Sequence, residues 1–125
     1  MKPGFLHYVP AREYETAELC AINELSNTAA DEDLSIARAR VPPGVATRWH
    51  VLRGIAERYV ILEGVGVAEV GEAAAERVAP GSVVLIPPGM RQRIRNTGAV
   101  DLVFLALCTP RFRPEAYEDV EDRSL

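Results

Sequence analysis

Lysine is almost absent from this sequence of 125 residues, which holds one lysine, Lys2, beside thirteen arginines. Acidic residues outnumber basic ones, and the formal net charge is -4. Nucleic acids and anionic membranes both attract basic surfaces, so this balance argues against either as the main partner. No apolar run approaches the ~18–20 residues of a membrane-spanning helix. The chain is 48% hydrophobic, which suffices for one folded domain spanning residues 1–125.

The first residues carry no recognisable secretion signal, and cysteine is rare. The first residues, from Met1 to Gly4, lead into no apolar segment of the kind that a signal peptide carries. Cys20 and Cys108 are the two cysteines, and they could pair in principle. Because no secretory signal is visible and the core needs no covalent link, we expect both thiols to stay reduced and the protein to be cytoplasmic.

Helical periodicity is nearly absent as well. Proline and glycine turns separate short β-rich segments roughly every 10 residues, a pattern typical of an all-β sandwich or barrel. The expected strands lie at 34–41, 47–52, 57–63, 66–70, 76–78, 82–86, 90–96 and 101–109. The segment 82–86 (SVVLI) is continuously apolar, which predicts a strand buried on both faces.

The two ends are less regular than the middle of the chain. We expect a barrel core over about 34–110, an N-terminal arm over 1–30 and a C-terminal tail over 114–125. Within the arm, residues 18–26 are a candidate for an extra strand. The tail is acidic and weakly apolar, so a short helical turn or a frayed end is expected there.

Two segments carry recognisable motifs. Residues 44–64 read GVATRWHVLRGIAERYVILEG, and residues 81–96 read GSVVLIPPGMRQRIRN. They resemble the two signature motifs of the cupin superfamily, G-x5-H-x-H-x3,4-E-x6-G and G-x5-P-x-G-x2-H-x3-N, with every spacing kept. The resemblance implies a double-stranded β-helix, a jelly-roll-like barrel. It also implies a pocket in which three histidines and one glutamate hold a divalent metal.

Both departures from these motifs fall on metal ligands. His50 and Glu57 are kept, whereas Leu52 stands in place of the second histidine and Gln92 in place of the third. The metal ligands that the resemblance leaves are therefore His50, Glu57 and Gln92. Such a set of nitrogen and oxygen donors accepts Zn, Ni, Mn, Fe or Cu with poor selectivity, and with two imidazoles missing we expect weak binding.

Strand alternation agrees with this placement. Residues two apart share a face of a strand, so Gln92 lies on the face opposite the arginines at 91, 93 and 95. Burying three arginines would be prohibitive, so Gln92 is expected to point inward. Arg48 shares a face with His50 and has two possible roles, a salt bridge at the pocket rim or a clamp for an anion.

Three functions stay open at this point, because a fold does not choose among them. The first is a metal-assisted enzyme (dioxygenase, isomerase or epimerase, or lyase) with Glu57 or Tyr59 as the acid–base group. The second is a metal-free module that binds a small polar or anionic molecule, and the third is a purely structural domain. The expected pocket lining is Arg48, Leu52, Tyr59, Ile61, Ile94 and Cys108.

We also expect a homodimer. The acidic, aromatic N-terminal segment, with a strand-like run from Leu19 to Leu25, is poorly explained as a free end. Cupins commonly pair through such segments, and pairing by symmetry removes exposed strand edges.

Overall fold

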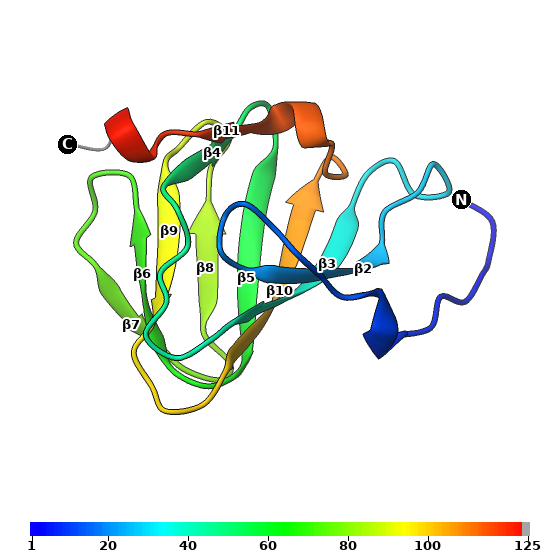
Figure 1. Cartoon of the computed structure of the whole chain (residues 1–125). Coiled ribbons are helices and arrows are strands. Elements are labelled where there is room, and N and C mark those ends of the chain that lie inside the picture. The colour runs from blue at the N-terminus through cyan, green and yellow to red at the C-terminus, as the bar shows by residue number, and fades with distance from the viewer. Residues whose placement is uncertain (124–125) are drawn as a thin grey trace.

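Short strands and tight turns follow one another along the chain, and the computed structural model, which describes residues 1–123, folds them into two facing antiparallel sheets (Figure 1). The strands are β1 (Tyr14–Glu15), β2 (Ala21–Ser26), β3 (Ser35–Val41), β4 (His50–Leu52), β5 (Ala56–Glu63), β6 (Gly66–Val70), β7 (Glu76–Val78), β8 (Val83–Ile86), β9 (Gln92–Asn96), β10 (Leu102–Thr109) and β11 (Tyr117–Asp119). Three single-turn 3-10 helices, η1 (Pro10–Arg12), η2 (Pro114–Ala116) and η3 (Glu121–Arg123), complete the described elements.

The larger sheet has six strands in the order β1-β2-β3-β10-β5-β8, and the smaller has five in the order β11-β4-β9-β6-β7. Their inner faces enclose the main core, which is built from Ala39, Val41, Tyr59, Ile61, Ala68, Val84, Ile86, Ile94, Leu102, Phe104 and their neighbours. This architecture confirms the predicted all-β, jelly-roll-like barrel. The expected strands all form, with ends shifted by up to three residues.

One motif glycine shows why the first motif ends as it does. Gly64 has φ +80°, and a Cβ atom there would lie 2.6 Å from the backbone oxygen of Asp101. An L side chain would therefore be both strained and in collision at the turn between β5 and β6. The glycine lets β10 begin directly beside this turn.

The strand β8 corrects one expectation. Val84 and Ile86 are buried as predicted, but Val83 is 56% exposed and Leu85 is 69% exposed. The strand lies at the edge of an antiparallel sheet whose inner face alone is covered by the other sheet. Its continuous apolar run therefore does not mean burial on both faces.

Both chain ends are more ordered than expected. In the arm, β2 pairs with β3 and carries β1 on its other edge. In the tail, the expected short helical turns form at η2 and η3, but β11 also adds a strand beside β4, at the top of Figure 1. The last tail residues, 124–125, lie outside the described residues. Within residues 1–123, none of the helical segments has the length and apolar character needed to cross a bilayer.

Candidate functional site

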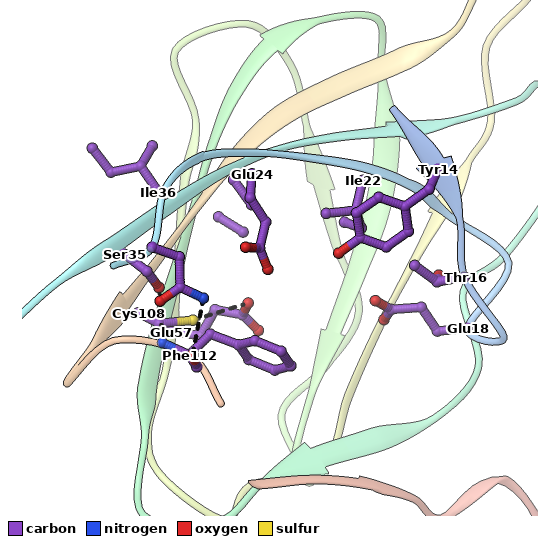
Figure 2. A pocket seen from close by; sticks show the side chains of 13 residues that line it. Tyr14, Thr16, Glu18, Ile22, Glu24, Ser35, Ile36, Glu57, Cys108 and Phe112 are labelled. Carbon is purple, nitrogen blue, oxygen red and sulfur yellow. Dashed lines mark hydrogen bonds between the residues drawn. The ribbon is translucent and has the colours of Figure 1, made fainter. Parts of the chain in front are cut away.

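Two adjoining cavities lie along the inner face of the larger sheet, and the smaller one also has residues of β4 and β11 in its lining. The larger has a volume of about 110 Å³ and the smaller about 40 Å³. Both are lined by Glu18, Ile22, Glu57, Ala106 and Phe112. Figure 2 shows the larger cavity, with side chains from the N-terminal arm on one side and from β5, β10 and the C-terminal segment on the other.

The first motif brings His50, Glu57 and Tyr59 to the lining of the smaller cavity, and Gln92 of the second motif lies behind them, bonded to Tyr59. His50, the first residue of β4, is paired with Gln92, the first residue of β9. Glu57 on β5 lies opposite Cys108 on β10. Because alternate residues of a strand share a face, Glu57 and Tyr59 both point inward from β5. All of these side chains are buried.

His50 is held in a defined orientation. Its Nδ1 atom lies 2.8 Å from the backbone oxygen of Arg48 and donates to it, and its ring stacks on Tyr117 with 5.1 Å between centroids. Its Nε2 atom is 3.5 Å from Glu18 Oε2. Burial raises the pKa of Glu18, and His50 partly opposes this. The contact between Nε2 and the carboxyl group is attractive when one of the two carries a proton, so His50 and Glu18 form a pair.

Glu18 reaches this position through a tight turn between β1 and β2. Thr16 closes the turn, since its Oγ1 donates to the backbone oxygen of Cys20 at 2.7 Å and its carbonyl accepts from the Leu19 amide at 3.2 Å. Leu19 has φ +70°, a conformation that L residues rarely adopt. The turn thereby directs the Glu18 side chain into both cavities.

Glu57 is incompletely satisfied. Its Oε2 atom accepts a weak hydrogen bond from Cys108 Sγ at 3.6 Å, whereas Oε1 has no hydrogen-bond partner within residues 1–123. Burial raises the pKa of Glu57, while His50 and the nearby Gln92 amide lower it. A buried carboxyl with a free oxygen is costly unless something else completes its bonds. Glu57 is thus the residue best equipped to meet a ligand or to move a proton.

Two further buried polar atoms lack partners. The Tyr59 hydroxyl donates to Gln92 Oε1, which leaves Gln92 Nε2 without a hydrogen bond among the described residues. The Tyr117 hydroxyl is likewise buried and, within the same residues, unpartnered. Burial raises the pKa of Tyr59 well above its usual value. Tyr59 therefore stays protonated in the unliganded protein and orients Gln92, and its acid–base role stays a prediction.

These residues fit a divalent metal poorly. Across residues 1–123, no group of three His, Cys, Asp or Glu side chains has an arrangement that could hold a metal ion. Leu52 fills the place of one ligand, and the oxygen of Gln92, which accepts a hydrogen bond from Tyr59, is a weaker donor than the imidazole it replaces. The metal site expected at His50, Glu57 and Gln92 therefore stays a prediction.

The remaining expected pocket residues divide into two groups. Leu52 and Tyr59 line the smaller cavity and Cys108 the larger. Ile61 and Ile94 pack in the main core and are not among the residues that line either cavity. Burial raises the pKa of Cys108, so its thiol stays protonated and acts as a small apolar wall.

Arg48 also lies away from both cavities. Its guanidinium pairs with Asp119 of β11, and this hydrogen bond lowers the pKa of Asp119. Of the two roles considered for Arg48, the geometry matches the salt bridge at the rim. An anion clamp would need the guanidinium of Arg48 to face one of the cavities, and Arg48 lines neither.

Sequence reasoning missed the residues that the two chain ends supply. Tyr14, Thr16, Glu18 and Glu24 come from the arm, and Phe112 and Tyr117 come from the C-terminal segment. None belongs to either motif, and the acidic character of the arm was the only signal available.

Comparisons with known proteins place the fold and the motifs in a family. The family model described as Cupin domain matches residues 37–108. The uncharacterized protein MJ1618 of Methanocaldococcus jannaschii is 34% identical over 116 residues, which cover 91% of this chain and 90% of that protein.

Two further proteins resemble parts or all of the chain. The endoribonuclease YbeY of Myxococcus xanthus is 33% identical over 90 residues, 70% of this chain, but the chain spans only 29% of that protein's length. The crystal structure of a predicted oxalate decarboxylase from Thermotoga maritima has a TM-score of 0.76 at 24% identity, covering 86% of this chain and 99% of that one. This structural similarity shows that the two proteins share a fold.

Proposed function

This chain belongs to the cupin domain family, and on that basis we propose that it binds a small polar molecule in the two adjoining cavities. One observation carries the proposal. Two residues that line the smaller cavity, Glu57 and Tyr117, each have a buried oxygen, Oε1 and Oη, without a hydrogen-bond partner among the described residues. Buried polar groups are normally satisfied, so such a cluster favours a site whose bonds are completed by a ligand.

The size and lining of the cavities support a small molecule with one polar end. A cavity of about 150 Å³ holds benzene in a well-studied case, so about 110 Å³ suits a molecule of a few heavy atoms. Ile22, Ile36, Ala37 and Phe112 offer apolar contacts in the larger cavity. The smaller cavity, with His50, Glu57 and Tyr117, accepts the polar end.

This proposal requires no metal, but one contact favours a second candidate. The Nδ1 atom of His50 donates to a backbone carbonyl, which is how metal-bound imidazoles are usually oriented. A weak divalent-metal site at His50, Glu57 and Gln92 is therefore kept as the alternative. Elemental analysis of untagged protein, followed by calorimetric titration of the chelator-treated protein, separates the two.

The binding proposal is tested by filling the cavity. Ala106 lines both cavities, so Ala106→Leu should abolish the chemical-shift changes that small alcohols, amines and amides cause at the His50 ring. Ala99→Leu, at an exposed turn, is the matched control. If Ala106→Leu binds as well as the unmodified protein, the cavities are not the site. If none of these compounds binds the unmodified protein, a structural role replaces the proposal.

A further inference from the structure

The ionisable side chains that line the two cavities are mostly acidic. Glu18, Glu24 and Glu57 line them, and none of the described lining residues is a lysine or an arginine. Figure 2 shows the three carboxyl groups turned toward the same space, near the rings of Tyr14 and Phe112. Since a low-dielectric cavity focuses the field of such groups, it should attract positive charge and repel anions.

The arginines of the chain do not offset this field from within. Arg40 pairs with Glu13 and Asp101, Arg48 with Asp119, and Arg53 with Glu118. These ion pairs lie outside the two linings. Among the described residues that line the cavities, His50 is the only basic one.

A separate observation points to a ligand at this cluster. Glu57 is only 8% exposed, lines both cavities, and has an oxygen without a hydrogen-bond partner in residues 1–123. The unpartnered Tyr117 hydroxyl is a second acceptor on the smaller cavity, and the Glu18 carboxyl is a third. A group with several hydrogen-bond donors would complete all three.

We propose that the molecule bound here carries a primary ammonium group, seated between Glu18, Glu57 and Tyr117. An ammonium is compact and has three donors, which suits a cavity of about 40 Å³ with three acceptors. The rings of Tyr117 and Phe112 add a favourable environment for a cation. This inference rests on the proposed function. It replaces the anionic ligand that was expected from Arg48 with a cationic one.

Three compounds of one shape test the charge preference: isobutylamine, isobutanol and isobutyrate at neutral pH. Binding is followed through the ring signals of His50, which are simple to assign because the chain has two histidines. Isobutylamine should bind at least about tenfold more tightly than the other two, the gain expected for hydrogen bonds to charged groups. Glu18→Gln and Glu57→Gln should each remove most of that preference, because each replaces a charged acceptor with a neutral amide.

The control is Glu72→Gln, which removes one charge from a side chain that is 95% exposed. Thermal melts followed by circular dichroism establish that each variant is folded. If isobutanol or isobutyrate binds as tightly as isobutylamine, the ammonium inference is overturned and small-molecule binding stands. If none of the three compounds binds, both are overturned. If ZnCl2 shifts the His50 signals, EDTA reverses the shift and isobutylamine has no effect, the metal alternative replaces the inference.

Discussion

At the scale of single residues, Leu52 separates this chain from the metal-binding form of its motif. Its side chain is buried against Ile55, Cys108 and Ala116, so the place of one ligand is closed by apolar atoms. Gln92 stands in the place of another ligand, and its side-chain oxygen accepts a hydrogen bond from Tyr59. The local fold is thus intact while the donor set has changed, which is why the fold and the cofactor need separate tests.

Restoring the ligand gives the first prediction. Leu52→His should tighten binding of Zn, Ni or Mn by about tenfold or more, because each added imidazole supplies a strong donor. The double variant with His50→Ala should lose that gain. Calorimetric titration after chelator treatment measures both. No gain in the single variant would mean that the pocket is not a latent metal site.

Glu57 gives a second prediction, on stability. Burying a carboxyl with a free oxygen costs more than burying an amide of the same shape, so Glu57→Gln should raise the free energy of unfolding by about 1 kcal/mol at neutral pH. Urea unfolding measures the change, with Glu72→Gln expected to be neutral. A loss of stability would show that the Glu57 carboxyl stabilises the unliganded fold, which contradicts an unmet hydrogen bond at this residue.

At the scale of elements, the arm is fastened to the larger sheet by an ion pair. Arg40 of β3 donates to Glu13, just before β1, with 2.6 Å between Arg40 Nη2 and Glu13 Oε1. This hydrogen bond holds the pKa of Glu13 below its usual value, against an opposing effect of burial. Because Glu18 follows on the same arm, the ion pair also helps to place the cavity wall.

The lowered pKa sets the sign of a third prediction. An acid with a lowered folded-state pKa stabilises the fold above its unfolded pKa, and this contribution disappears as the pH falls through the folded value. Glu13→Gln should therefore be less stable than the unmodified protein at neutral pH. The gap should close as the pH falls below about 4. Thermal melts across this range measure it, and a gap that stays constant with pH would contradict the ion-pair explanation.

At the scale of the whole molecule, the outer face of the larger sheet is the surface that suits a second copy of the chain. The arm first expected to mediate dimerisation pairs with β3 through β2, but Tyr14 and Leu19 stay about half exposed, so pairing through the arm stays a prediction. On the outer face of β8, however, Val83 and Leu85 remain exposed, and Leu62 of β5 is 43% exposed. Neighbouring apolar side chains of this kind favour an interface.

The fourth prediction follows from that face. The protein should have a dimeric mass in light scattering, and Leu85→Glu should shift it toward the monomer by placing a charge in the interface. Leu19→Glu, in the arm first expected to pair, should leave the mass unchanged, and a monomeric mass for this variant alone would place the interface at the arm instead. A monomeric mass for the unmodified protein would refute the dimer.

The sequence by itself determined the strands, the barrel and the inward positions of His50, Glu57 and Gln92. These features depend on short-range patterns: turns at proline and glycine, a side-chain period of two, and motif spacings that keep three ligand positions in register. Even the outward placement of Arg93 and Arg95 followed from the cost of burying charge, and the structure confirms it.

Only the tertiary structure decided what surrounds those residues. Glu18 meets His50 because the β1–β2 turn lies against β4, and Tyr117 meets it because β11 pairs with β4. The pairing of Arg48 with Asp119 also depends on β11. Such contacts join segments far apart in the chain, and strand patterns do not say which strands become neighbours. The acidic lining of the two cavities is therefore a property of the closed barrel, because the acidic arm supplies carboxyl groups but no local pattern places them beside the motif residues.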